Sequence, residues 1–539
     1  MQFVPTNSQL LERSMSMIAR AGIARFGNVI LMRKISMNPA VQQAKYAVRG
    51  AILERAMEIE KDLLNPETAS KWPFEKIVRC NIGNPQALGQ RAPKFSRHVL
   101  SLLMNPELIG KNLYSQEAEE RAQAYLAQVS GNSIGAYSDS KGIKLVREEV
   151  ADFIYKRDGF ECDPDNIYIT DGASTAIKRV VSLLMTGDSS DALFLPFPQY
   201  PLYSALVSLS GGVAAPYYLT EGDWSINSHE LEINYQAAID QGKKPRAFVF
   251  LNPGNPSGAT MNRQAIETII RFCQDKKLPL LADEVYQDNI YHGPSFISAR
   301  KVVHELGAHD LPLFSFHSIS KGFTGECGLR GGYMEVTNLD NEFKAQISKL
   351  ANMSLCSNVP GQIAVGLMVN PPSSEIEAHN YKTQRDEILA SLKRRSEIVA
   401  DTLNALPGIS CPRAQGALYV FPSIQVPKRA VLAAKQKNIA PDLFYCIRML
   451  EATGLVTVPG SGFGQREGTF HFRSSFLPSE SDIHDVMKRL ETFHLTFLDE
   501  FADEQELQQL HSQSSPTAEN ESLSFNLVND TPTSASARA

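Results

Sequence analysis

The sequence lacks three features that would assign it to particular classes of protein. It contains seven cysteines but no Cys-x-x-Cys pair, which argues against a disulfide framework and against a zinc site. It has no apolar run approaching the roughly 20 residues that a membrane helix requires. Basic residues are interspersed with acidic ones and the net charge is −6, so no nucleic-acid partner is indicated. We therefore expect no metal, no membrane span and no nucleic-acid binding.

What is present is the composition of an ordinary globular protein. Apolar residues make up 43% of the chain and charged residues 21%. A chain of 539 residues is long enough for two or more domains, each with its own core. The seven cysteines are therefore interpreted as free thiols in a reducing compartment.

The first 35 residues differ in composition from the rest. Glu12 is their only acid, and it stands against a set of basic residues: Arg13, Arg20, Arg25, Arg33 and Lys34. An arginine-rich, acid-poor and amphipathic start is typical of an organellar transit peptide. It predicts import into the mitochondrial matrix. The alternative is a disordered or misassigned leader on a cytoplasmic protein.

Four further segments follow the leader. Residues 36–134 are expected to form an N-terminal segment, with an arm and part of a small domain; a helix is predicted over 50–64 within it. Residues 135–355 form a large domain and 356–500 a C-terminal small domain. The chain after about Glu500 is polar, so 501–539 is predicted to be a disordered tail.

The large domain alternates strands and helices. Apolar runs predict strands at 167–170, 192–195, 247–251, 278–281 and 313–316. Helices are predicted over 175–185 and from about Asn262. This alternation indicates an α/β fold, with a mostly parallel sheet covered by helices on both faces. Ligands of such sheets bind beyond the carboxyl ends of the strands.

Four chemically useful side chains follow these strands. Lys321 is preceded along the chain by an amide, Asn255, a carboxylate, Asp283, and a phenol, Tyr286. A carboxylate beside a ring nitrogen keeps that nitrogen protonated, so the set indicates a site for a cationic heteroaromatic cofactor. Taken alone, Asn255 is equally well a turn former, and the others are equally well surface caps or salt-bridge partners.

An anion-binding site is indicated next to them. Ala173 and Ser174 stand at the start of a predicted helix, where free backbone N–H groups favour a phosphate. Ser318 and Arg330 flank Lys321 and would complete a phosphate cup, since arginine binds oxyanions in bidentate fashion. Tyr200 could stack on a flat ring. The alternatives are a simple serine cap and a buried core tyrosine.

Two other motifs are similar to those of unrelated protein classes. Ser318-Ile-Ser-Lys321 matches the Ser-x-x-Lys pattern of penicillin-binding acyl enzymes, but the Ser-Asp-Asn and Lys-Thr-Gly strings of that class are absent. Gly460-Ser-Gly-Phe-Gly464 is similar to a dinucleotide fingerprint. However, Gln465 replaces the third glycine and the string follows Val-Pro. A mobile loop or plain turn is the better interpretation.

The order and spacing of these motifs resemble those of fold-type I pyridoxal-phosphate aminotransferases. The general marks are residues 255–258, 283–286, 318–321 and Arg473. Marks similar to an alanine-specific subgroup are residues 37–41, 45–50, 81–86, 134–142, 199–203, 325–328 and 458–468. The resemblance covers about residues 36–500. Arg330 stands nine residues after Lys321, as in that subgroup, whereas most members have eight; the polar tail is not explained.

The resemblance implies a role for each residue around pyridoxal 5′-phosphate. Lys321 would form a Schiff base and then move the substrate α-proton, while Asp283 would keep the pyridine nitrogen protonated. The remaining roles are as follows: Asn255 and Tyr286 on the ring phenolate; Tyr200 on the ring face; Ala173, Ser174, Ser318, Arg330 and the neighbouring subunit's Tyr137 on the phosphate; Arg473 on the substrate α-carboxylate; Gly83 and Asn84 on the substrate side.

The implied reaction transfers the amino group between L-alanine and 2-oxoglutarate, in a homodimer with sites at its interface. Glyoxylate as acceptor remains open. So does a related pyridoxal-phosphate lyase, similar to aminocyclopropane-carboxylate synthase, which would keep the same cofactor residues. A third alternative is a non-catalytic regulator with an aminotransferase domain, although no helix-turn-helix or basic segment supports it.

Overall fold

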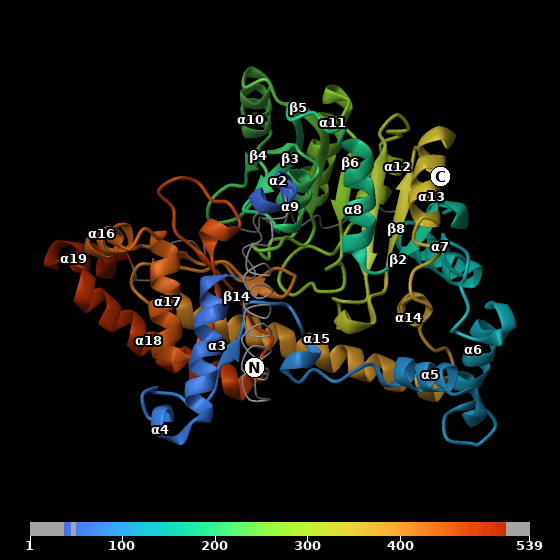
Figure 1. The fold of residues 1–539 in the computed structure, drawn as a ribbon, viewed down its shortest axis with the longest axis horizontal. Helices are drawn as coiled ribbons and strands as arrows, with labels where there is room; N and C mark the ends of the chain where they lie inside the picture. Colours follow the sequence, from blue (N-terminus) through green and yellow to red (C-terminus); the bar gives the residue numbers. More distant parts are fainter. Residues whose placement is uncertain (1–36, 45–49, 514–539) are drawn as a thin grey trace, which may run out of the picture. The chain divides into compact units, whose positions relative to one another are not determined.

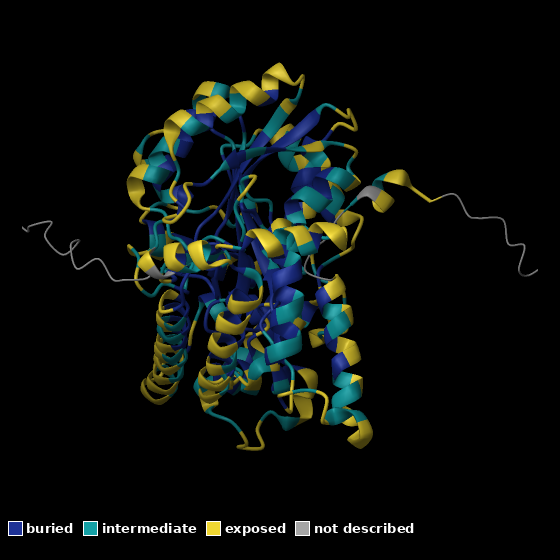
Figure 2. Ribbon diagram, turned by 90° about the vertical axis from the view of Figure 1, so that its left-hand side faces the viewer, coloured by how far each residue is buried: buried dark blue, intermediate teal, exposed yellow. Residues whose placement is uncertain are grey.

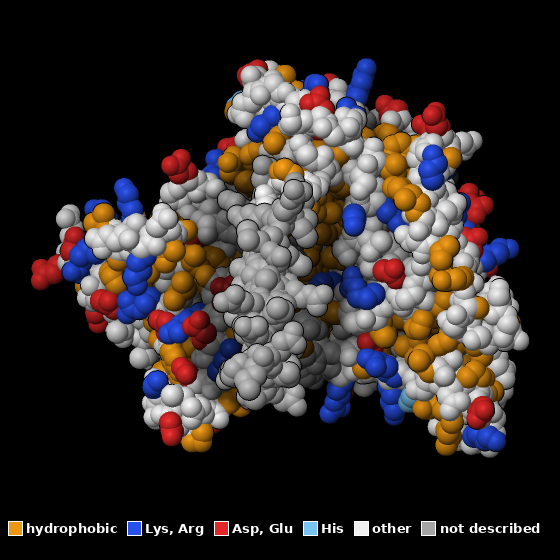
Figure 3. Space-filling view, in the orientation of Figure 1, with side chains coloured by type: hydrophobic (Ala, Val, Ile, Leu, Met, Phe, Trp, Pro, Cys, Tyr) orange, Lys and Arg blue, Asp and Glu red, His pale blue; other side chains and the backbone are white. Residues whose placement is uncertain are grey.

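The computed structural model describes residues 37–44 and 50–513 of the chain. The predicted leader, 1–35, and residues 514–539 of the predicted tail lie outside the described residues. In the described part, no helix is both long and apolar enough to cross a membrane. The same residues contain no group of three or more His, Cys, Asp or Glu side chains that could hold a metal ion. On the face drawn in Figure 3, charged side chains of both signs are intermixed.

The chain divides into two compact units, residues 1–44 and 45–539. In the first unit the structure describes a single helix, α2 (Pro39–Gln43), whose first turn is capped by the Asn38 side chain accepting from the Ala40 N–H. Everything that follows concerns the second unit.

A seven-stranded sheet dominates the middle of the second unit (Figure 1). Its strands run in the order β2-β8-β7-β6-β5-β3-β4, and all neighbours are parallel except that β8 is antiparallel to both β2 and β7. The bounds are β2 Ile167–Thr170, β3 Asp191–Phe197, β4 Val213–Tyr218, β5 Lys244–Leu251, β6 Leu280–Asp283, β7 Leu313–Ser318 and β8 Gly332–Thr337. The predicted α/β fold with a mostly parallel sheet is confirmed.

Helices cover both faces of this sheet, because successive strand residues point to opposite sides. Phe194 of β3 packs in a cluster with α10 (Ser228–Asp240), α11 (Arg263–Lys276) and α12 (Ala299–Glu305). Its neighbour Leu193 packs in a second cluster, with α8 (Ala173–Leu184), α9 (Leu202–Leu209) and α13 (Asn341–Asn352). Most strand residues between these layers are buried and dark blue in Figure 2, whereas the edge strand β4 is only partly buried.

A third cluster lies on the β2 side of the sheet. It joins α5 (Lys94–Met104), α6 (Gln116–Leu126), α7 (Lys144–Asp158) and α14 (Val359–Val369). The predicted boundary at residue 356 would assign α14 to the C-terminal domain. Its packing instead favours a boundary after α14, and the division into domains remains a prediction.

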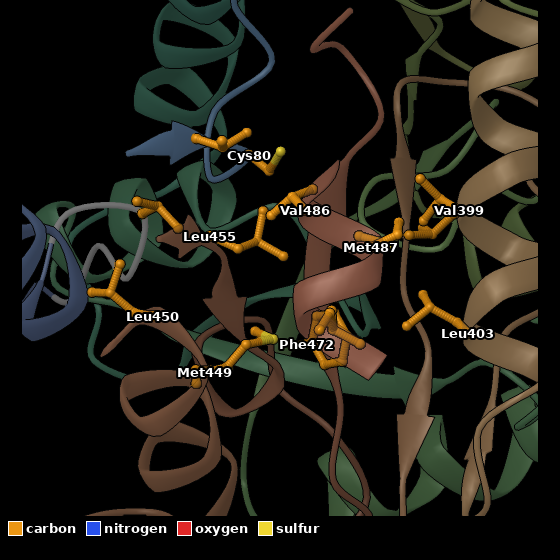
Figure 4. Close-up of a cluster of buried hydrophobic side chains, with 14 of the residues drawn as sticks. Cys80, Val399, Leu403, Met449, Leu450, Leu455, Phe472, Val486 and Met487 are labelled. Carbon is orange, nitrogen blue, oxygen red and sulfur yellow. The ribbon is translucent and has the colours of Figure 1, made fainter. Parts of the chain in front are cut away.

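The C-terminal part has a separate core, part of which is shown in Figure 4. Helix α3 (Ala51–Leu64), predicted over 50–64, joins this core, and β1 (Val78–Arg79) pairs with β12. The short helix α4 (Pro66–Ala69) follows α3. The C-terminal elements are α15 Glu375–Asn404, β9 Ile409–Ser410, β10 Tyr419–Val420, β11 Ser423–Ile424, α16 Lys428–Gln436, α17 Pro441–Thr453, β12 Leu455–Val456, β13 Val458–Pro459, β14 Phe472–Ser475 and α18 Glu480–Phe501. Residues near 80 and near 455 are therefore neighbours in space.

The start of the predicted disordered tail is corrected by the structure. Helix α18 continues to Phe501, and a further helix, α19, spans Glu504–Gln513. Asp503 and Glu506 cap α19 reciprocally: each side chain accepts a hydrogen bond from the other residue's backbone N–H. Leu510 is buried, so this polar segment has one apolar contact that favours its ordering.

Candidate active site

A cavity of about 260 Å³ lies beyond the carboxyl ends of the sheet strands. Its lining contains every residue predicted for the site except Tyr137: Gly83, Asn84, Ala173, Ser174, Tyr200, Asn255, Asp283, Tyr286, Ser318, Lys321, Arg330 and Arg473. A larger cavity of about 560 Å³ shares Leu251 and Asn255 with it but has no Lys, Arg or His in its lining. Of these two cavities, the smaller one therefore has the cationic side chains in its described lining.

Tyr137 does not line this cavity, and the residue is 71% exposed. Nothing in a single chain brings it to the phosphate end of the site. Its predicted role requires a second copy of the chain, as the resemblance implied.

Strand pairing brings the acid and the amine together. Strands β6 and β7 are parallel neighbours, with Asp283 opposite Phe316, so both strands end at the same edge. Lys321 follows the end of β7 by three residues, and its Nζ donates to the Gly83 carbonyl at 2.8 Å. A side chain at position 83 would collide with this arrangement, because a Cβ there would lie 2.3 Å from the Tyr419 hydroxyl. Glycine at this position lets the backbone approach the lysine.

Asp283 is fully enclosed, and burial raises the pKa of its carboxyl from 3.8 to about 6. The Tyr203 hydroxyl donates to its Oδ2 at 3.0 Å, which partly offsets that effect. The other oxygen, Oδ1, is buried with no hydrogen-bond partner among the described residues. A buried carboxylate oxygen without a donor is costly, so this atom favours a ligand that carries an N–H or a positive charge.

The predicted anion site is built at the start of α8. Arg330 Nη2 lies 3.2 Å from both the Ser174 hydroxyl and the Asp171 carbonyl, which places its guanidinium beside the first turn of the helix. Gly172 leaves room for it: φ is +78°, and a Cβ would lie 2.4 Å from Arg330 Nη2. Ser318 lies at the end of β7 and donates to the Gly331 carbonyl at 3.1 Å. A helix N-terminus beside a guanidinium favours a phosphate-sized anion.

Arg473 supplies a second cationic group. Strand β14 carries it into the cavity wall, where it is 1% exposed. Its Nη1 donates to Asn255 Oδ1 at 3.0 Å and its Nη2 to the Asn81 carbonyl, while Nε has no partner. Among the described residues it makes no ion pair with an acid. A buried guanidinium without a counter-charge favours a carboxylate ligand.

Four residues with polar or sulfur-bearing side chains in the cavity or its support were not predicted from the sequence. Tyr203 lies in the 199–203 motif, of which only Tyr200 was given a role, and Ser320 and Cys327 lie just before and shortly after the lysine. Tyr419 packs its ring 4.2 Å from the Arg473 guanidinium, measured between Cζ and the ring centroid. Burial raises the pKa of the Tyr419 phenol, but the nearby charges of Lys321 and Arg473 outweigh burial, and the net shift is downward.

These residues fit the pyridoxal phosphate implied by the resemblance. The unpartnered Asp283 oxygen can accept from a protonated ring nitrogen, and the α8 terminus with Arg330 can hold a phosphate. Asn255 and Tyr286, whose side chains lie 3.5 Å apart, can both reach a ring oxygen. Ser320 Oγ is a further buried hydroxyl without a partner in the described part of the cavity. The donor set thus matches both the charge and the polarity of that cofactor.

Removing the Tyr203 hydroxyl tests the electrostatics of the acid. In Tyr203→Phe, the pKa of Asp283 should rise further, because a hydrogen bond that favours the charged form is lost. One such bond is worth about 1 kcal/mol, so kcat should fall about fivefold at neutral pH, and the acid limb of the kcat–pH profile should move to higher pH. An acid limb that stays in place would show that the bond does not tune the acid.

The match between fold and site extends to known sequences. The family model for aminotransferase class I and II matches residues 108–490, and the chain belongs to this family. The probable mitochondrial alanine aminotransferase of Dictyostelium discoideum is 47% identical over 473 residues, which cover 86% of this chain and 88% of that protein. Alanine aminotransferase 1 of Homo sapiens is 44% identical over 475 residues, covering 86% and 95%.

Solved structures agree. The alanine aminotransferase from Pyrococcus furiosus superposes with a TM-score of 0.67 at 25% identity and covers 86% of this chain and 100% of its own. An aminotransferase from Escherichia coli gives a TM-score of 0.66 at 25% identity, covering 86% and 98%. The chain is therefore an aminotransferase in both sequence and fold.

Proposed function

We propose that this aminotransferase uses pyridoxal 5′-phosphate to transfer the amino group between L-alanine and 2-oxoglutarate, giving pyruvate and L-glutamate. The observation that carries the proposal is a single cavity containing Lys321, the half-satisfied acid Asp283 and the unpaired guanidinium of Arg473. Relatives at 42–47% identity over most of the chain are named alanine aminotransferases, which supports this substrate.

Each side chain has one task in this reaction. Bound pyridoxal phosphate supplies a protonated ring that accepts electron density from the substrate. Asp283 keeps the proton on the ring nitrogen, because a carboxylate buried beside that nitrogen stabilises its charged form. Arg473 holds the substrate α-carboxylate and thereby orients Cα. The Lys321 amine can then take the proton from Cα and return it, as general base and acid.

The second carboxylate of 2-oxoglutarate has no obvious partner in the cavity. Of the described residues that line it, the cationic ones are Lys321, Arg330 and Arg473, which already have assigned tasks. This observation keeps glyoxylate, which has no second carboxylate, as an alternative acceptor. Comparing pyruvate formation from L-alanine with 2-oxoglutarate and with glyoxylate, on purified protein loaded with pyridoxal phosphate, distinguishes the two. Failure to form pyruvate with either acceptor would overturn the proposal and would favour the alternative of a related lyase.

Two further proposals concern assembly and location. We infer that the enzyme is a homodimer in which the exposed Tyr137 reaches the phosphate site of the partner copy. Analytical ultracentrifugation, with Tyr137→Phe measured for cofactor affinity, tests this. Relatives named mitochondrial, together with the arginine-rich leader, support import into mitochondria. A fluorescent fusion of residues 1–35 that stays outside mitochondria would contradict it.

Arg473→Gln tests the carboxylate site. Because both substrates carry an α-carboxylate in ground and transition states, the loss should appear mainly in KM. A charge-assisted pair is worth about 1.5–3 kcal/mol, so both KM values should rise about 10- to 100-fold. Arg413→Gln is the matched control, since Arg413 pairs with Asp401 on the surface and should leave KM unchanged. An unaltered KM in Arg473→Gln would remove this residue from the substrate site.

A further inference from the structure

His471 stands two residues before Arg473 on the same strand segment. Alternate residues of a strand share a face, so His471 and Arg473 point the same way while Phe472 points to the other side. Figure 4 shows Phe472 among the apolar side chains of the C-terminal core. The His471 side chain is completely buried, yet the imidazole has polar partners on both sides.

Both ring nitrogens of His471 face acceptors. Nε2 lies 3.0 Å from Glu221 Oε2, and Nδ1 lies 3.0 Å from Gln465 Oε1. The orientation of the Gln465 amide is set from its other end, where Nε2 donates to Asp442 Oδ2 at 3.3 Å. A neutral imidazole donates only one hydrogen bond, so satisfying both acceptors requires the doubly protonated ring.

The charges around this ring come from several elements. Glu221 follows β4, Asp442 lies on α17 behind Gln465, and Arg473 is on the same strand. Arg466, in the loop before β14, is itself paired with Glu230. Glu221 is the one acid in direct contact with the imidazole among the described residues.

A continuous set of ring contacts connects His471 to Arg473. The imidazole stacks on Phe421, with ring centroids 4.8 Å apart and planes 5° from parallel. Phe421 meets Phe463 edge to face at 5.7 Å, and the Phe463 ring centroid lies 4.7 Å from Arg473 Cζ. Phe463 and Gln465 belong to one loop. The imidazole contacts that loop directly at Gln465, and it contacts it indirectly through Phe421, which packs on the Phe463 ring next to the Arg473 guanidinium.

We propose that His471 acts as an imidazolium that joins Glu221 to the 460–468 loop and thereby positions Arg473 for the substrate carboxylate. Loss of the ring proton would leave either Glu221 or Gln465 without a donor and loosen the loop. The same loop is fixed to the sheet by Phe463, whose carbonyl accepts from the Gln199 N–H at 2.8 Å. This proposal rests on the function proposed above for Arg473.

Glu221→Gln is the main kinetic test. It keeps the shape and an acceptor oxygen but removes the charge that favours the protonated ring. KM for L-alanine should rise about three- to tenfold at neutral pH, with kcat within about twofold of the wild-type value. Asp401→Asn is the control: it breaks the exposed ion pair with Arg413, touches neither His471 nor the 460–468 loop, and should leave KM unchanged. A wild-type KM in Glu221→Gln would overturn the proposal.

A second measurement does not depend on activity. Histidine-¹⁵N NMR of the full-length protein should show two protonated nitrogens for His471 at neutral pH, assigned by their loss in His471→Phe. A singly protonated ring throughout would refute the imidazolium, even in an active enzyme. Conversely, if the ring is doubly protonated but the protein forms no pyruvate, the proposed reaction is wrong while the imidazolium is supported.

Discussion

Replacing Lys321 with alanine should reduce transamination by about 10⁴-fold or more, because the cavity loses both its covalent anchor and its proton-transfer group. The other cationic side chains of the cavity cannot substitute. In the described cavity lining they are Arg330, held at the α8 terminus, and Arg473, held by Asn255. A guanidinium has hydrogen-bond donors but no acceptor, so neither side chain can act as a base.

The measurement pairs turnover with mass spectrometry after borohydride reduction. Wild-type protein should retain pyridoxal phosphate covalently at Lys321 and the variant should not. Lys178→Ala is the matched control, because Lys178 lies exposed on α8, the helix whose start supplies Ser174. Appreciable pyruvate formation by Lys321→Ala would contradict the assignment of this lysine.

Asp283→Asn should lower kcat by about 10²- to 10³-fold, comparable to the loss of one preorganised electrostatic group. Asparagine preserves the volume and can still accept from the Tyr203 hydroxyl, but it does not hold a proton on a ring nitrogen. Covalent attachment of the cofactor to Lys321 should persist, because that step uses the amine. Asp288→Asn, five residues after the end of β6 and outside the cavity lining, should keep its activity. A wild-type rate in Asp283→Asn would exclude the electron-sink role of this acid.

The same substitution should stabilise the protein prepared without cofactor. Burial raises the pKa of Asp283 from 3.8 to about 6, so the native state holds this proton more tightly than the unfolded state. The stability that this bound proton gives the folded state is fully present below about pH 3.8 and is lost as pH rises through about 6. At neutral pH the loss is about 3 kcal/mol. Asparagine removes that dependence. Thermal unfolding at pH 4 and pH 8 should therefore show a stabilised variant at the higher pH only.

Much of the sheet could be predicted from apolar runs alone. Strands such as β6 and β7 are buried on both faces, so they appear as continuous hydrophobic segments between turns. Strand β4 was missed because it lies at the edge, is only partly buried and contains Pro216. The antiparallel direction of β8 depends on how the chain returns after Arg330. Local composition carries no information about that direction.

The candidate site was predictable where a single residue type defines the chemistry. Lys321, Asp283 and Arg473 are a nucleophile, an acid and a cation in positions that few other functions require. The supporting contacts are long-range: Tyr203 lies 80 residues before Asp283, and Tyr419 lies 133 residues after Tyr286. The Gly83 carbonyl that accepts from Lys321 belongs to the backbone, so its role leaves no side-chain signal.

The tail shows a signal that composition concealed. Asp503 and Glu506 have the spacing of a capping box, and Leu507 and Leu510 follow at helical spacing. The composition of the whole segment after residue 500 is dominated by the polar residues that follow, so it does not indicate this short amphipathic helix. Residues 504–513 are helical for that local reason, and the prediction of disorder from residue 501 was wrong for this stretch.

Helix α19 also matters for anyone who shortens this chain. Arg429 at the start of α16 donates to the carbonyls of Phe501 and Ala502, and the Lys428 N–H donates to Glu506. Leu510 covers Gly408, where a Cβ would lie 2.7 Å from a leucine methyl. Recombinant versions trimmed at residue 500 would expose the apolar surface beneath Leu510 and remove the acceptors that Lys428 and Arg429 of α16 use, which favours aggregation. Ending no earlier than Gln513 avoids both.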